Sequence, residues 1–186
     1  MKHLFTVFSF VLLLSCSKSE KDEGPSIQTP SSPVPESLRT GTWFTGTLSP
    51  ISYYDRDGHH VGSEYEAGRE FTFDNNNGKG KMKFWQYIGL RTSSSCTTEH
   101  YTYKEGTIVF DGEIFTFYPV TGNFKTVKAG CSSGNGTTPR VAEGDDLEPF
   151  SFRWEVKILQ GVPHLYTYEV DDVAHENPVF VYEQVK

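Results

Sequence analysis

The strongest constraint on the fold is an alternation of apolar and polar residues in the segment 150–158. Every second residue there is apolar, and these residues are Phe150, Phe152, Trp154, Val156 and Ile158. A strand with one buried and one solvated face has this period of two, whereas a helix repeats every 3.6 residues. The segment is therefore predicted to be a half-buried antiparallel strand.

Shorter runs of the same kind recur along most of the chain. They cover residues 69–74, 81–90, 100–104, 107–111, 113–119, 123–128, 164–170 and 179–185. Residues that tolerate positive φ separate nearly all of them, at Asp57-Gly58, Asn76-Asn77-Gly78, Asp111-Gly112, Gly122-Asn123 and Gln160-Gly161. About eight to ten short strands at hairpin spacing predict an all-β fold, namely an antiparallel meander closed into a barrel, with a β-sandwich as the alternative.

A short motif, Gly41-Thr42-Trp43, stands ahead of the first expected strand. It resembles the start of lipocalin-like (calycin) barrels, in which a Gly-x-Trp stands at the barrel entrance, and the segment 106–117 resembles the meander of small lipocalin-like lipoproteins. The resemblance implies a lipocalin-like β-barrel for residues 38–186. That length fits one domain, so we expect a single β domain over 38–186.

The N-terminus predicts export. Lys2 precedes an apolar run from Leu4 to Leu14, which is too short to span a bilayer as a helix and is typical of a secretory signal peptide. The residues Leu13-Leu14-Ser15-Cys16 resemble the lipobox of bacterial lipoproteins. The resemblance implies cleavage before Cys16 and attachment of acyl chains, palmitate among them, to Cys16. Residues 1–15 are therefore expected to be a lipoprotein signal peptide.

Residues 16–37 are expected to be the lipidated cysteine and a flexible tether rich in Pro and Ser. Within it, Lys21-Asp22-Glu23 resembles the export signal of surface-exposed lipoproteins of the Bacteroidota, and Ser17 is not the aspartate that signals retention in the inner membrane. The resemblance implies an outer-membrane protein, anchored by lipid and facing the cell exterior. If these charges only solvate the tether, the domain faces the periplasm instead.

The net charge limits which macromolecules the chain is expected to bind, and the cysteine content predicts a disulfide. The formal net charge is −7 and no Lys or Arg cluster stands out, so neither nucleic acid nor an anionic membrane surface is an expected partner. With Cys16 assigned to lipid, Cys96 and Cys131 remain in a chain exported to a compartment where disulfides persist. We predict a disulfide between Cys96 and Cys131, with two free thiols as the alternative.

No motif indicates catalysis, a metal or a cofactor. Asp55-Arg56-Asp57-Gly58 lacks the third oxygen ligand and the distal glutamate of a calcium loop, and His59 and His60 would point to opposite faces of a strand. Ser93-Ser94-Ser95 has no Gly-x-Ser-x-Gly setting. We expect a non-enzymatic protein with no catalytic residue, no metal and no cofactor. An enzyme with carboxylates brought together by the fold remains the less favoured interpretation.

Aromatic residues are the candidates for ligand binding. In the segment 81–88, Met82 and Phe84 share one face while Trp85 and Tyr87 share the other, so both faces are partly apolar. A ring on such a face stacks against a flat ligand, unless a loop or the tether covers it. The ligand-binding residues predicted on this basis are Trp85, Tyr87, Tyr101, Tyr103, Tyr166 and Tyr168.

The expected function is binding of a small apolar or sugar-like molecule by a membrane-anchored domain. The long segment 129–149 is rich in glycine and is expected to be a loop, which could cover the barrel mouth as a lid. A structural or accessory subunit of an outer-membrane protein complex is the alternative, and it would require an exposed apolar patch.

Overall fold

The computed structural model describes residues 29–47, 53–54, 60–61, 65–93 and 95–185. The predicted signal peptide, Cys16, Lys21-Asp22-Glu23 and the segment 55–59 lie outside the described residues. The elements, in chain order, are η1 (Glu36–Leu38), β1 (Thr42–Thr47), β2 (Tyr53–Tyr54), β3 (His60–Val61), β4 (Tyr65–Asn76), β5 (Lys79–Arg91), β6 (Thr97–Asp111), β7 (Ile114–Ala129), β8 (Gly136–Val141), η2 (Gly144–Leu147), β9 (Phe150–Leu159), β10 (Val162–Tyr168) and β11 (Phe180–Val185).

Eight of these strands form a closed ring of antiparallel hydrogen bonds. The order around the ring is β1, β4, β5, β6, β7, β9, β10 and β11, and β11 pairs again with β1. Every pairing is antiparallel, so the prediction of an all-β antiparallel meander with barrel-like closure is confirmed. Within the described residues, no helix is long and apolar enough to cross a membrane.

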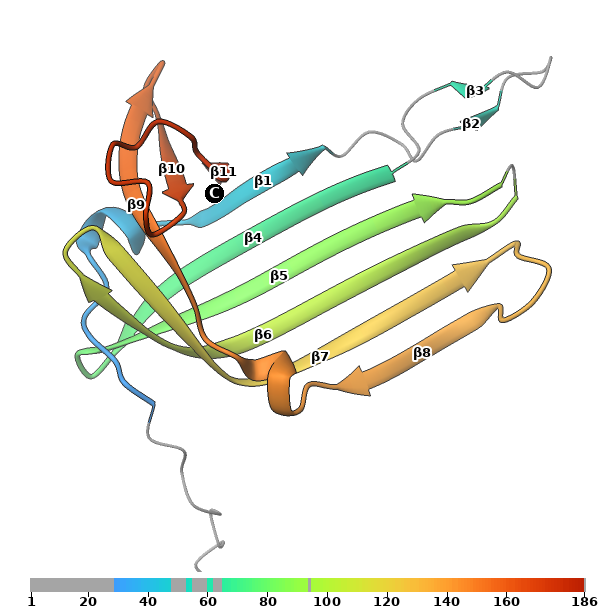
Figure 1. Ribbon diagram of the computed structural model, residues 1–186, viewed down its shortest axis with the longest axis horizontal. Coiled ribbons are helices and arrows are strands. Elements are labelled where there is room, and N and C mark those ends of the chain that lie inside the picture. The colour runs from blue at the N-terminus through green and yellow to red at the C-terminus, as the bar shows by residue number, and fades with distance from the viewer. Residues whose placement is uncertain (1–28, 48–52, 55–59, 62–64, 94, 186) are drawn as a thin grey trace, which may run out of the picture.

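The sheet continues beyond the ring on one side (Figure 1). β9 pairs with β7 only over Ile114, Phe115, Thr116 and Phe117, and β8 pairs with β7 farther along, from Asn123 to Lys128. Because β5, β6 and β7 are 13, 15 and 16 residues long, their ends extend past the barrel as an open sheet. We call this open sheet the platform, and it comprises residues 65–70, 85–91, 97–104, 122–129 and 136–141.

Aromatic side chains fill the barrel. Phe71, Phe115, Phe117 and Tyr182 are completely buried, and the Phe71 and Tyr182 rings stack with their centroids 4.6 Å apart. Burying a side chain of this size stabilises a fold by about 1.5–3 kcal/mol. At one end, Trp43 is buried and its indole Nε1 donates a hydrogen bond to the Leu38 carbonyl at 3.0 Å. This end is therefore closed.

The predicted strand at 150–158 is present as β9. Phe150, Phe152, Trp154 and Val156 pack against the core, as the alternation predicts. Ile158, which shares their side of the strand, is 64% exposed because it lies near the end of β9, beyond the core.

The packed part of the chain begins before Leu38, where the domain was expected to start. Ser32 donates its backbone N–H to the Ile108 carbonyl at 3.0 Å and accepts a hydrogen bond from the Gly80 N–H at 2.9 Å. Val34 is buried in the core, and its N–H donates to Asn75 Oδ1 at 2.8 Å. The segment 29–35 is thus held against the closed end of the barrel by apolar contact and by hydrogen bonds.

Two further segments differ from the expectation. β8 and η2 form within 129–149, where the sequence predicts a long loop; all six residues of β8 are exposed, so no apolar alternation marks it. β7 runs without interruption through the expected turn at Gly122-Asn123. The predicted disulfide is confirmed, because Cys96 and Cys131 are bonded beside the paired ends of β6 and β7.

Candidate ligand-binding site

The candidate site lies where the barrel opens onto the platform. Two adjoining hollows there share Arg69 of β4 and Gln86 of β5. One has a cavity volume of about 250 Å³ and is also lined by Phe84, Phe150, Phe152, Phe71 and Lys104. The other, of about 230 Å³, is bordered by Phe180 and by the strands β1 and β4. We call the two hollows together the mouth.

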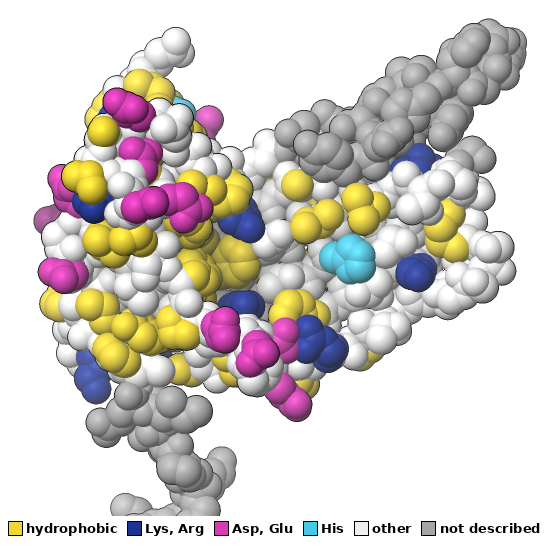
Figure 2. All heavy atoms as spheres, in the orientation of Figure 1, with side chains coloured by type: hydrophobic (Ala, Val, Ile, Leu, Met, Phe, Trp, Pro, Cys, Tyr) yellow, Lys and Arg dark blue, Asp and Glu magenta, His cyan; other side chains and the backbone are white. Residues whose placement is uncertain are grey.

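The mouth has an aromatic floor and a polar rim. Figure 2 shows apolar side chains at the base of a hollow, with basic side chains at its edges. The Phe84 and Phe150 rings meet edge to face at 6.1 Å, and the Phe150 and Phe152 rings do so at 5.7 Å. These rings come from β5 and β9, which face each other only because the sheet closes into a ring. Their surfaces suit a flat apolar group.

Arg69 lies across the floor of the mouth. Its guanidinium carbon is 4.1 Å from the centroid of the Phe180 ring and 5.6 Å from that of Phe84, and Nη2 donates to Gln86 Oε1 at 3.4 Å. Cation–π contacts of this kind stabilise by about 0.5–2 kcal/mol and hold the planar group in place. Among the described residues, no carboxylate forms an ion pair with Arg69.

Lys104 is the second basic residue of the mouth. It lies opposite Phe84 in the register of β5 and β6. Burial lowers the pKa of Lys104, because the charged ammonium loses solvation, while the Asp146 carboxylate acts in the opposite direction. Lys104 therefore retains a partly desolvated positive charge in contact with the mouth.

Asp146 belongs to η2 and is engaged by another residue. Its carboxylate accepts hydrogen bonds from the Arg140 guanidinium and from the Glu143 backbone N–H. The hydrogen bonds from Arg140 and then from Glu143 lower the pKa of Asp146 to about 2. Asp146, the carboxylate that acts on Lys104, thus already has a cationic partner in Arg140.

The alternation of side chains places four of the predicted residues on the other side of the platform. Trp85 and Tyr103 face each other across β5 and β6 with ring centroids 4.2 Å apart, and Tyr87 and Tyr101 do so at 5.2 Å. We call these four residues the outer patch, and Trp85 is 47% exposed. The structure brings the four together, but on the face opposite the mouth.

Carboxylates surround the outer patch. The hydroxyl groups of Tyr87, Tyr101 and Tyr103 donate to glutamates, and the respective partners and distances are Glu66 at 3.4 Å, Glu99 at 3.2 Å and Glu105 at 2.6 Å. Burial, followed by the Glu105 hydrogen bond, raises the pKa of Tyr103 to about 12, and burial together with nearby glutamates raises that of Tyr87 to about 12. These hydroxyls stay protonated and tied to their glutamates at neutral pH.

The remaining two predicted residues lie on the barrel wall, apart from both sites. Tyr166 has the Lys157 ammonium 4.6 Å from its ring centroid. Tyr168 is 1% exposed, lies beneath His175 with ring centroids 4.7 Å apart, and donates its hydroxyl to Glu155. Tyr168 is therefore covered and unable to stack against a ligand in this conformation.

The residues of the mouth were not selected from the sequence. Phe84 was assigned to the face opposite Trp85, which is correct, but nothing in a single strand says which face turns toward the barrel. Arg69 lies two residues from Phe71, and Gln86 lies two residues from Phe84, so the four side chains are on the same face of the sheet. This spacing is the one signal in the sequence that could have identified Arg69 and Gln86. Their convergence with Phe150 depends on closure of the ring.

No group of three or more His, Cys, Asp or Glu side chains is arranged to hold a metal ion in the part of the chain that the structure describes. The mouth therefore offers rings, a guanidinium, an ammonium and an amide as its binding groups. Comparison of the chain with family models, with curated proteins and with solved structures gives no match.

Proposed function

We propose that this protein is an outer-membrane lipoprotein, anchored through Cys16 and facing the cell exterior, that binds a small sugar-like ring in the mouth without catalysing a reaction. The proposal for the anchor rests on the lipobox-like residues that end at Cys16. The proposal for the ligand rests on one observation, the aromatic floor of the mouth with Arg69, Gln86 and Lys104 around it.

The depth of the mouth favours a ring over a long acyl chain. Phe71, Phe115 and Leu165 are fully buried beneath it, so the barrel interior is filled by the protein's own side chains. A long chain would have to displace this core, at a cost of several kcal/mol. A hollow of about 250 Å³ is below the usual size for a drug-like ligand and suits one or two sugar rings.

The groups that line the mouth match the surface of a sugar. Phe150 is partly exposed in the hollow and offers apolar surface for the C–H side of a pyranose, with the buried Phe84 ring packed beside it. Gln86 supplies both an acceptor and two donors for hydroxyl groups, and Arg69 supplies further donors. These groups hold a ligand by stacking and hydrogen bonding, which supports binding rather than catalysis.

A glycan screen followed by calorimetry tests this proposal. Gln86→Ala should weaken binding of the selected glycan at least fivefold, because it removes a hydrogen-bonding side chain from the mouth without touching the core. Trp85→Ala, on the outer face of the same strand, is the matched control and should leave the affinity within twofold. Failure of any glycan to bind the mature protein would contradict the proposal.

A second function is supported by the outer patch. Exposed Trp and Tyr rings with a polar rim are typical of protein-binding hot spots, and Trp85 with Tyr103 fits that description. This feature favours an accessory subunit that docks on an outer-membrane complex. In the same pair of variants, loss of a co-purifying membrane protein with Trp85→Ala but not with Gln86→Ala would favour docking by the outer patch.

A further inference from the structure

The carboxylates of the platform strands all lie on one of its two faces, whereas basic residues occur on both. By alternation and register, the face continuous with the barrel interior carries Arg69, Lys104, Lys128 and Arg140, together with His100. On the described platform strands, every carboxylate lies on the opposite face, and these residues are Glu66, Glu70 and Glu99. The strands of this face thus carry basic side chains and no carboxylate of their own, while η2 places Asp146 beside them, paired with Arg140.

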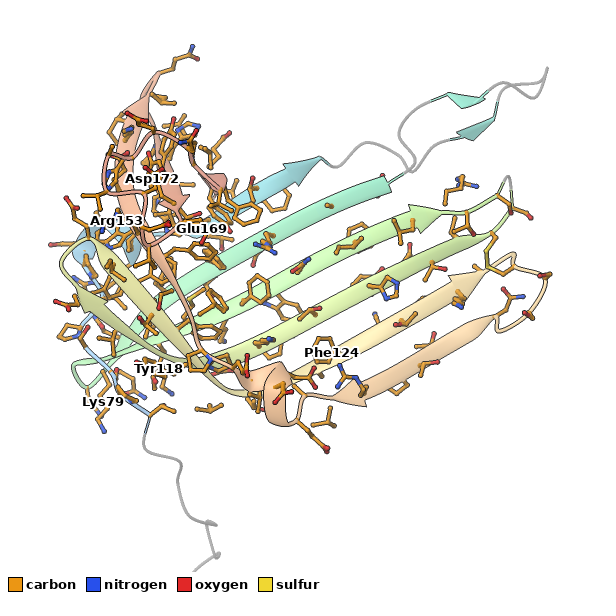
Figure 3. The ribbon with its side chains drawn as sticks, viewed as in Figure 1. Lys79, Tyr118, Phe124, Arg153, Glu169 and Asp172 are labelled. Carbon is orange, nitrogen blue, oxygen red and sulfur yellow. A yellow bond between two sulfur atoms is a disulfide. The ribbon has the colours of Figure 1, made fainter. Side chains whose placement is uncertain are left out.

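Side-chain contacts confirm which residues share this inner face. His100 Nδ1 lies 3.1 Å from Thr126 Oγ1, and the Arg140 guanidinium carbon lies 4.2 Å from the centroid of the Phe124 ring. Phe124 is on the side of β7 that faces the viewer in Figure 3, as is η2. The inner face therefore runs from the mouth past Phe124 toward the far end of the platform.

We propose that the mouth and the inner face together bind an acidic oligosaccharide, with one anionic group held between Arg69 and Lys104. This inference rests on the proposed function and specifies its ligand class. One sugar ring stacks on Phe84 and Phe150, and the chain continues over the inner face toward His100.

The positive charges of Arg69 and Lys104 are the reason why the mouth should prefer an anionic sugar to a neutral one. Both are partly removed from water and lie against aromatic rings, Arg69 over Phe180 and Lys104 beside Phe84. A partly desolvated cation gains most from a carboxylate or sulfate that enters the same site, because the local dielectric constant is lower than that of water. A neutral sugar would leave this gain unused.

The rest of the inner face favours an oligosaccharide over a nucleic acid. Hydroxyl groups are present on three strands of this face, from Thr102 of β6, Thr126 of β7 and Thr138 of β8, with Thr98 buried at its far end. Single-stranded nucleic acids need successive exposed rings on which bases stack. Phe124 is the one Phe, Tyr or Trp whose side chain the structure describes on this part of the inner face, and the Arg140 guanidinium already lies over its ring.

Calorimetric titration of the mature lipoprotein in zwitterionic nanodiscs tests the inference. The probes are a hexamer of galacturonic acid, a neutral hexamer of glucose and a hexamer of thymidylate. The galacturonate should bind at least tenfold more tightly than the glucose hexamer, and its affinity should fall as salt is raised because its contacts are charged. The thymidylate should bind no better than the glucose hexamer.

Substitutions that remove one charge localise the site. Arg69→Gln and Lys104→Gln should each weaken galacturonate binding about tenfold, as expected for loss of a charge-assisted hydrogen bond. Lys83→Gln and Lys125→Gln remove the same charge from the outer face and should change it less than twofold. Lys104→Gln is a second test in case Arg69→Gln misfolds, because it is Arg69 that packs over the Phe180 and Phe84 rings.

Each result that differs from these expectations would overturn one part of the inference. Equal binding of the two sugars, unaffected by Lys104→Gln, would overturn the acidic class and leave a neutral sugar in the mouth. Binding of thymidylate as tight as that of galacturonate would overturn the choice of oligosaccharide. Equal losses for inner-face and outer-face variants would show a general charge effect and overturn the site. No binding of either sugar would overturn the inference, and the glycan screen described above would then show whether the proposed function fails as well.

Discussion

At the scale of single residues, position relative to the sheet decides what each aromatic ring does. Phe84 and Trp85 are neighbours in the chain, yet one is buried in the floor of the mouth and the other is about half exposed on the outer face. The sequence predicts this division between Phe84 and Trp85, because side chains alternate along a strand. It does not predict which ring faces the barrel, since that depends on the other seven strands of the ring.

Gly80 is the residue whose substitution should be most informative for stability. A Cβ atom there would lie 2.3 Å from the Ser32 carbonyl oxygen and 3.0 Å from methyl groups of Val34 and Ile108. We expect Gly80→Ala to lower the free energy of unfolding by about 1–3 kcal/mol through overpacking, as measured by urea denaturation. In a chain that begins at Pro33 and so lacks Ser32, Gly80→Ala should lower the free energy of unfolding by clearly less. The same loss in both chains would contradict the contact with Ser32.

At the scale of elements, a strand is predictable from the sequence where apolar and polar residues alternate along it. β9 is predicted almost to its ends, because Phe150, Phe152 and Trp154 alternate with polar residues along one buried face. β8 is missed, because both of its faces are exposed and Pro139 stands within it. Hydrogen bonds to β7 and the contacts of Arg140 with Phe124 and Asp146 hold β8 in place, and these interactions leave no alternating apolar pattern in the sequence.

The disulfide should stabilise the platform locally. Cys96 and Cys131 close the far ends of β6 and β7, away from the buried rings of the barrel. The chain-entropy model gives an upper value of roughly 4 kcal/mol for a loop of this length. In the double variant Cys96→Ser/Cys131→Ser, we expect faster amide exchange at Thr98 and Lys128, with Phe115 and Phe117 unchanged. Equal acceleration at all four positions would show that barrel and platform unfold together.

At the scale of the whole molecule, closure of the ring creates the mouth. Phe84 and Phe150 are far apart in the chain and meet because the sheet closes into a ring, and the ring opens beside them where β7 changes its partner from β9 to β8. The period of two predicts the strands and the meander, but the candidate site arises from the unequal lengths of β7 and β9. The lengths of β7 and β9 are fixed by hydrogen bonding to neighbouring strands. The residues within one strand do not predict that pairing.

The proposed anchor makes a prediction for the molecule in its cell. Cys16→Ala removes the acylated thiol, so the protein should lose incorporation of labelled palmitate and move from the membrane fraction to the soluble fraction. Ser17→Ala is the matched control and should stay membrane-bound. Retention of the Cys16→Ala protein in membranes, together with palmitate labelling, would contradict the assignment of Cys16.

The attachment of residues 29–35 also determines how such a protein would stand on its membrane. The segment enters beside the turn between β4 and β5, near Lys79 and at the opposite end of the barrel from the mouth (Figures 1 and 3). Thirteen residue steps separate Cys16 from Thr29, which limits their distance to at most about 45 Å. A lipid on Cys16 would thus be attached through the closed end, and the mouth and the platform lie at the end of the molecule away from that attachment.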